Sequence, residues 1–333
     1  MNCSFSSVRA FQAAMPVSYG WYLLGVALAL GRDVDALVAA AEGLHSCPLG
    51  AGAVAGTDLP IDPARTAALL GFRGPVRHAL DAVASRDVLL RLLAAAAGLA
   101  VTLSRLATDL QLWSTEELGF VRFPDRLVGG SSAMPQKRNA FLLEHLKAKP
   151  GQVIGAWTAA AGTIAATPFT NTIEVGTEAT EQVWPGLAAA EQAVLLAQVL
   201  VSGARPVPER MAQRAESGFT TATAIANQLV QQGIPFRTAH HQVGEAVRRA
   251  VAAGAGTLAE SGPPGWLDGI EQRDLPGQVA AHGYGGGPGG FRPQHQAARA
   301  GWVEHLRWHQ QWQTELAAAD TALADAVRAV MPA

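Results

Sequence analysis

Cysteine, lysine and charged residues in general are scarce in this 333-residue chain. Its two cysteines, Cys3 and Cys47, do not have the spacing of a metal or redox motif, which argues against a disulfide framework and suits a reducing cytoplasm. Charged residues make up 16% of the chain and the net charge is −2, so the basic footprint of a nucleic-acid-binding protein is missing. We therefore expect a cytoplasmic protein that does not bind nucleic acid.

Strand-like and membrane-like patterns are also missing. No run of alternating β-branched residues predicts a sheet. Residues 1–11 (MNCSFSSVRAF) lack a charged start followed by an apolar run, so no signal peptide is predicted, and residues 1–7 are expected to form a tail. The uncharged stretch 150–173 contains Gln152, Asn171 and an internal Pro168, which make it too polar for a membrane span. We expect a soluble protein.

Long helices that are apolar on all sides dominate what is present. Such helices have to be surrounded by others, either from the same chain or from other subunits, so the pattern predicts an all-α bundle. Asp62 and Pro63 form a typical helix start, and Gly71 can end that short helix. The expected longer helices are 15–44 (interrupted at Gly31), 83–113, 141–167, 184–201, 221–231, 236–253 and 294–330.

Proline and glycine divide the chain into expected domains. Pro206 and Pro208 end the pattern of long apolar helices, and shorter helices follow. We expect a central bundle domain at 1–213, a small helical domain at 214–290 and a C-terminal helix at 291–333. The glycine cluster at 283–290 follows no predicted strand, so we interpret it as a mobile loop instead of a dinucleotide-binding motif.

The most informative stretch is 129–139 (GGSSAMPQKRN). Two glycines provide a flexible start, two hydroxyls follow, and Pro135 is expected to begin a helix that carries Lys137 and Asn139. Lysine occurs in this chain only at positions 137, 147 and 149. A lysine in a Gly/Ser loop can hold an anionic group while the loop brings Ser131 over a ligand.

This stretch resembles the G-S-S-x-M-P-x-K-x-N signature of the fumarase/aspartase superfamily. Residues 48–72, 104–139 and 218–247 are similar to argininosuccinate lyases, and roughly residues 9 to 290 can be laid along that family without large gaps. The resemblance implies a homotetrameric lyase that needs no metal or organic cofactor. It implies β-elimination of a group from a succinyl-type dicarboxylate, with release of fumarate or a related alkene.

The resemblance also implies which residues act. Ser131 matches the family's catalytic serine, which removes a proton α to a carboxylate, and Lys137 and Asn139 match residues that hold the carboxylate. Glu144, expected about one and a half helical turns after Asn139, matches a glutamate that pairs with a histidine. The expected catalytic residues are Ser131 and Glu144, and the expected substrate-binding residues are Lys137, Asn139, Gln12, Ser132, Met134 and Arg9.

One departure from the family concerns that histidine. The family's T-H-x-Q element aligns with residues 9–12, so Ala10 occupies the histidine position and Arg9 the threonine position, while Gln12 is retained. Arg9 could form a fixed ion pair with Glu144, but an arginine cannot give up its proton at neutral pH. Unchanged activity and folding of Arg9→Met would contradict this pairing.

A second departure lies in the segment that binds the leaving group. Argininosuccinate lyases have tyrosine, glutamine and lysine at positions where this chain has Asn171, Gly176 and Ala179. The groups that would recognise an arginine-like leaving group are therefore missing, and argininosuccinate is not the expected substrate. A changed substrate is typical of lyases recruited to specialised metabolism, and the scarcity of lysine beside abundant alanine, glycine and arginine suits a GC-rich genome.

A third departure is that family members begin more than a hundred residues earlier, with a domain that carries an S-R-N element of the active site. Three explanations stay open: a start further upstream, a split enzyme with the missing domain on another chain, or a shortened and inactive relative. The alternative to a lyase is therefore a non-catalytic scaffold or the partner subunit of a split lyase.

One further cluster has metal-ligand spacing. His305 and His309 lie four residues apart beside Glu304, but no third ligand is in register. We interpret them as the polar face of a helix and expect no metal site.

Overall fold

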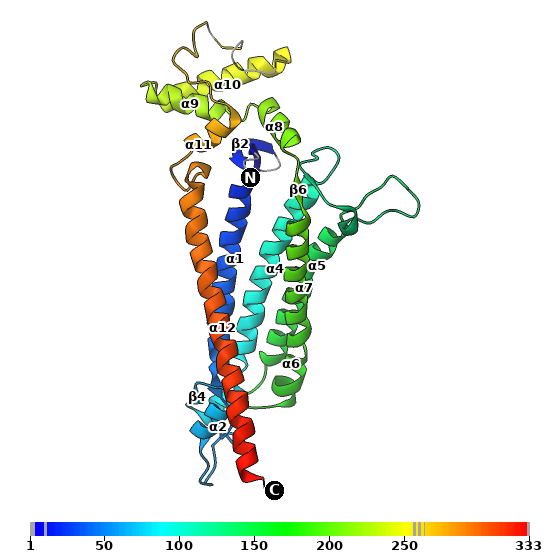
Figure 1. Cartoon of the computed structure of the whole chain (residues 1–333), viewed down its shortest axis with the longest axis vertical. Coiled ribbons are helices and arrows are strands. Elements are labelled where there is room, and N and C mark those ends of the chain that lie inside the picture. Colours follow the sequence, from blue (N-terminus) through cyan, green and yellow to red (C-terminus); the bar gives the residue numbers. More distant parts are fainter. Residues whose placement is uncertain (1–3, 10–11, 256–257, 259–260, 263, 332–333) are drawn as a thin grey trace. The chain divides into compact units, whose positions relative to one another are not determined.

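The computed structural model describes residues 4–9, 12–255, 258, 261–262 and 264–331, and it confirms the all-α class (Figure 1). The chain forms two compact units. The first comprises Met1–Ala27, Leu110–Arg126 and Gly203–Ala297, and the second comprises Leu28–Asp109, Leu127–Ser202 and Ala298–Ala333.

The second unit is a helical bundle with an alanine-rich core. Ala96 and Ala100 of α4 pack with Val153 of α5 and with Ala189 and Ala190 of α7, and Leu37 of α1 contacts this cluster. Small side chains let the helices approach closely, as the sequence predicts. The bundle is built from α5 (Phe141–Ile164), α6 (Ala179–Glu181) and α7 (Val183–Gly203), and from the parts of α1 (Tyr19–Ala41), α4 (Asp87–Trp113) and α12 (Phe291–Val330) that fall within the unit.

Two of the expected long helices are divided differently from the prediction. Helix α1 continues through Gly31, because one glycine inside a helix costs only about 1 kcal/mol and packing of the helix compensates for it. The helix expected at 83–113 is divided into α3 (Ala79–Ala84) and α4. The backbone of Ser85 is extended (ψ 139°), and the Ser85 hydroxyl donates to the Asp87 carboxylate at 2.5 Å.

A small subdomain of the second unit lies between α1 and α4. It contains the 3-10 helix η1 (Glu42–His45), the parallel pair β3 (Ser46–Cys47) and β4 (Gly74–Pro75), and α2 (Pro63–Leu69). The Asp62 side chain accepts the Arg65 N–H at 2.9 Å with Pro63 at the first helical position, which confirms the predicted helix start. Helix α12 contacts this subdomain: Trp312 lies 5.1 Å from the His45 ring.

The first unit contains a β-hairpin that includes residues 4–7, so the expected N-terminal tail is wrong for these residues. Strands β1 (Ser4–Arg9) and β2 (Gln12–Ser18) pair in antiparallel register, with Arg9 opposite Gln12, and β1 contacts α8 (Pro208–Ser217). A second antiparallel pair joins β5 (Val121–Arg122) to β6 (Arg205–Pro206). These pairings join residues that local periodicity cannot connect.

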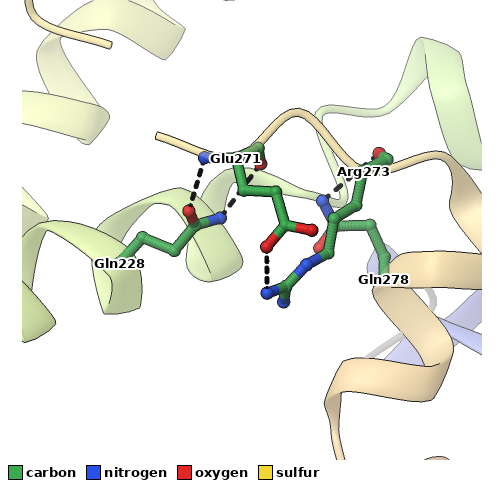
Figure 2. A network of polar contacts seen from close by, with 4 residues as sticks. All are labelled: Gln228, Glu271, Arg273 and Gln278. Carbon is green, nitrogen blue, oxygen red and sulfur yellow. Dashed lines mark hydrogen bonds and ion pairs between the residues drawn. The ribbon is translucent and has the colours of Figure 1, made fainter. Parts of the chain in front are cut away.

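Helices α9 (Ala222–Gln231) and α10 (Phe236–Ala253) pack around an apolar cluster that includes Ile225, Leu229 and Val243. Figure 2 shows how the segment before α11 (Leu275–Ala281) is attached to α9. Gln228 exchanges two hydrogen bonds with the backbone of Glu271, at 2.8 and 3.2 Å, and Glu271 forms an ion pair with Arg273. In the glycine cluster, residues Pro288–Gly290 form a 3-10 turn, and Trp21 donates to the Gly286 carbonyl at 3.3 Å.

Two helical runs of the described residues have the length and apolar composition to cross a membrane: α4 and Glu174–Gly203. Only 28% of the apolar window in α4 and 39% of that in Glu174–Gly203 is buried within the chain. Two such runs are weak evidence for a membrane protein, because core helices of bundles have the same composition.

Candidate active-site loop

Residues Gly129 and Asn139 close the glycine- and serine-rich stretch into a loop. Their backbones form an antiparallel bridge in which each N–H donates to the carbonyl of the other at 2.8 Å. We call this pair the loop neck. The loop emerges from the second unit between the short 3-10 helix η2 (Asp125–Leu127) and α5. A closed neck brings the ends of the loop together whatever its tip does.

Inside the loop, the Ser131 hydroxyl oxygen accepts two backbone N–H groups. Ala133 donates to Oγ at 3.3 Å and Met134 donates to it at 3.2 Å. Both donors stabilise negative charge on this oxygen, which is the condition under which a serine can accept a proton from carbon. The arrangement is local, since all three residues lie within four consecutive positions, and the short Ser-x-x turn in the sequence is its only signal.

The helix expected from Pro135 is wrong. Pro135 and Gln136 form a turn in which the Lys137 N–H donates to the Met134 carbonyl at 3.0 Å, and α5 begins only at Phe141. The bridge at the loop neck holds Asn139 in extended backbone, so a helix cannot start before it. Ser132, Met134 and Lys137 are exposed on the loop, and Asn139 is half-buried at the neck.

Because the helix expected from Pro135 does not form and α5 begins at Phe141, Glu144 does not share a helix with Asn139. It lies in the first turn of α5, where the positive end of the helix dipole favours a carboxylate. Its side chain is exposed. Ser131, Lys137, Asn139 and Glu144 thus all belong to the second unit, on one loop and the helix that follows it.

The remaining predicted site residues belong to the first unit. Arg9 and Gln12 are the last and first residues of β1 and β2, at the turn of the hairpin, and Gln12 is exposed. Ala10, the residue at the family's histidine position, lies outside the described residues. The ion pair between Arg9 and Glu144 stays a prediction.

The segment that departs from the family pattern folds around a π-helical turn, Glu174–Glu178. Such turns are frequent at functional sites. The Asn171 side-chain oxygen accepts from Arg86 at 3.3 Å, and it also lies 2.8 Å from where a Cβ on Gly176 would stand. The Thr172 side chain and the backbone N–H of Glu174 lower the pKa of the exposed Glu174 carboxyl.

The histidine pair on α12 does not form a metal site with other described residues, and His305 contacts a carboxylate of another helix instead. His305 Nε2 lies 2.7 Å from the Asp35 carboxylate of α1. No group of three or more His, Cys, Asp or Glu side chains among the described residues is arranged to hold a metal ion.

Sequence reasoning missed one neighbour of the loop. The Phe141 ring lies directly against Gly129, where a Cβ on the glycine would be 3.0 Å from the Phe141 Cδ1. The sequence carries no signal for this contact, because a phenylalanine in the first turn of an apolar helix is usually a core residue.

Comparison with known proteins identifies relatives of the N-terminal half of the chain and of a segment in its C-terminal half. A family model described as lyase matches residues 10–155, and one described as argininosuccinate lyase C-terminal matches residues 219–261. The argininosuccinate lyase of Thermus thermophilus is 43% identical over 243 residues, which are 73% of this chain and 52% of that protein. The argininosuccinate lyase of Methanoculleus marisnigri is 42% identical over 238 residues, which are 71% of this chain and 48% of that protein. The chain therefore spans about half the length of these relatives.

Solved structures agree. EDDS lyase in complex with formate is 28% identical, with a TM-score of 0.87 over 98% of this chain and 68% of that one. An EDDS lyase variant with bound fumarate is 27% identical, with the same TM-score and coverage. Class II fumarase from Schistosoma mansoni, 20% identical, shares the fold with a TM-score of 0.66 over 78% of this chain and 57% of that one. The family models and the two argininosuccinate lyase relatives together show that the chain is an argininosuccinate lyase-like member of the fumarase/aspartase superfamily.

Proposed function

We propose that this lyase catalyses β-elimination from a succinyl-type dicarboxylate and cleaves a bond between carbon and nitrogen or another heteroatom. Ser131 removes the proton α to a carboxylate, and the electron pair left on that carbon forms the new double bond as the leaving group departs from the β carbon. Lys137 and Asn139 hold the carboxylate on which negative charge develops, with Ser132, Met134 and Gln12 contributing to binding. Glu144 takes part in proton handling. Fumarate or a related alkene is released.

The observation that carries this proposal is the pair of N–H groups directed at the Ser131 oxygen in a loop whose neck is closed. A serine without such donors is a poor base near neutral pH. The fumarate bound to an EDDS lyase variant supports the class of product, since that structure is similar to 98% of this chain.

We propose further that argininosuccinate is not the substrate. At the three positions where argininosuccinate lyases bind the arginine-like leaving group, this chain presents a short amide, a glycine and an alanine, and the alanine (Ala179) is buried. The Asn171 amide is already engaged by Arg86. A leaving group without a guanidinium fits these residues better.

Several broader features belong to the same proposal. The protein is a homotetramer, because helices as apolar and as little buried as α4 and α7 need partners. It acts in the cytoplasm. Its domains are a central helical bundle at 1–213, a small helical domain at 214–290 and a C-terminal helix at 291–333. A domain carried on a separate chain would complete the active site if the protein is one part of a split enzyme.

The test is the appearance of fumarate, followed by ultraviolet absorbance, when the purified protein meets argininosuccinate, adenylosuccinate, aspartate or N-substituted aspartates. Loss of the general base should lower the rate by about 10²-fold or more in Ser131→Ala. Ser217→Ala, at the exposed end of α8, should retain the wild-type rate. Equal rates in wild type and Ser131→Ala would exclude Ser131 as the base.

A non-catalytic relative is the alternative, and Ala10 at the position of the family's histidine is the observation that favours it. It predicts no product from any of these substrates. It also predicts that the chain raises the activity of, or co-purifies with, an intact lyase when the two are produced together.

A further inference from the structure

We propose that Phe141 is a positioning residue for the Ser131 loop, acting through its contact with the loop neck. The inference rests on the proposed function for its catalytic consequence but not for its structural one. Phe141 is the first residue of α5, so its ring is attached to a packed helix at the point where the loop ends. It therefore connects a rigid element to a loop whose other residues lie mainly at the surface.

The contact is specific to one of the two glycines. A Cβ on Gly129 would stand 3.0 Å from the Phe141 Cδ1 and 3.3 Å from its Cε1, closer than ordinary van der Waals contact. A Cβ on Gly130 would meet nothing within 4 Å. Neither glycine has a positive φ, so alanine fits the backbone at both positions and only the ring distinguishes them.

A second ring holds Phe141 from its own helix. His145, one turn further along α5, lies with its ring centroid 6.0 Å from that of Phe141 at an interplanar angle of 80°. Edge-to-face contacts of this kind favour one relative arrangement of the two rings. Phe141 is 38% exposed, so it is not a core residue, and its contacts with Gly129 and His145 contribute to its position.

As a consequence, the adjacent residues Gly129 and Gly130 have different roles. The ring and the backbone bridge to Asn139 hold Gly129 in place, while Gly130 has open space around it and is followed directly by Ser131. The loop tip can then move while Gly129, close to Ser131 in the sequence, stays fixed. Without the ring, the starting point of the loop is less well defined and Ser131 reaches its reactive position less often.

Trypsin provides a probe of the loop that does not depend on activity. Lys137 and Arg138 are exposed on the loop, and cleavage after them is read by mass spectrometry of the fragments. We expect Phe141→Ala and Gly129→Ala each to raise the initial rate of this cleavage several-fold. Gly130→Ala is the matched control and should not, and Phe141→Tyr, which keeps the ring, should restore the wild-type rate.

The double variant sharpens the test. Because both changes disturb one contact, Gly129→Ala combined with Phe141→Ala should be cleaved no faster than either alone, whereas independent effects would multiply. Wild-type cleavage rates in both single variants, or multiplied rates in the double variant, would overturn the proposal. Thermal melting identifies a variant that is cleaved only because it is unfolded, and then the remaining single variant and Phe141→Tyr decide the question.

Kinetics separate the two proposals. If the protein is a lyase, Phe141→Ala should lower kcat, because Ser131 reaches its reactive position less often, and Phe141→Tyr should recover kcat. A lyase with an unchanged kcat in Phe141→Ala would overturn the positioning role. A protein without lyase activity would refute the proposed function, and the cleavage rates would still decide whether Phe141 holds the loop.

Discussion

At the scale of single residues, the ion pair between Glu271 and Arg273 has a defined dependence on pH. The hydrogen bond from the Arg273 guanidinium lowers the pKa of the Glu271 carboxyl below its ordinary value of 4.5. A carboxyl whose pKa is lower in the folded state stabilises folding above its unfolded pKa and loses this contribution as pH falls through the folded pKa. Since the pair is exposed, solvent screens it and its effect is small.

We therefore expect Glu271→Gln to lower the melting temperature slightly at neutral pH. The difference from wild type should be constant above about pH 4.5 and should shrink as the solution is acidified further. Melting curves from pH 7 to pH 3 measure it, with Glu117→Gln in the exposed turn after α4 as the control. A difference that grows on acidification would mean that the pair does not act in this way.

At the scale of secondary-structure elements, the start of α2 offers a direct test of a cap that the sequence predicts. Asp62→Ala removes the acceptor of the Arg65 N–H and should destabilise the protein by about 1 kcal/mol. Asp58→Ala, an exposed change in the preceding loop, is the matched control. Urea unfolding of both variants gives the comparison, and equal midpoints would show that the cap contributes nothing.

Predictions succeeded where local chemistry decides the structure. The bounds expected for α10 are those observed, because Pro235 precedes the helix and Gly254 ends it in the left-handed region at φ 64°. They failed where pairing between backbone segments decides. The pairing of Gly129 with Asn139 stands where a helix was expected from Pro135, and pairing with β2 places residues 4–7 of the expected tail in a strand.

The same distinction applies to the candidate site. The composition of the loop and its resemblance to a family signature are sufficient to predict Ser131, Lys137 and Asn139 as site residues. The N–H groups at Ser131 and the ring at Gly129 are properties of the folded backbone. The Ser-x-x turn is the only sequence signal for the N–H groups, and no residue type or spacing indicates the ring contact at Gly129.

At the scale of the whole molecule, the composition of α7 conflicts with its exposure in a single chain. Trp184, Leu195 and Val199 are 65%, 53% and 47% exposed, although α7 belongs to one of the two runs apolar enough for a membrane. Exposed apolar surface of this kind marks an interface. A helical bundle completed by further copies of the chain satisfies it in water, whereas a membrane protein would need detergent.

We expect the purified protein to be a tetramer in detergent-free buffer, measured by analytical ultracentrifugation. Placing a charge in the interface should dissociate it, so Leu195→Glu should sediment as a smaller species while its helical circular dichroism is retained, because this side chain contributes little to the core of its own chain. Gln313→Glu, on the exposed surface of α12, adds the same charge outside this face and should remain tetrameric. A wild-type monomer, or a Leu195→Glu variant that stays tetrameric, would show that α7 is not the surface on which the copies meet.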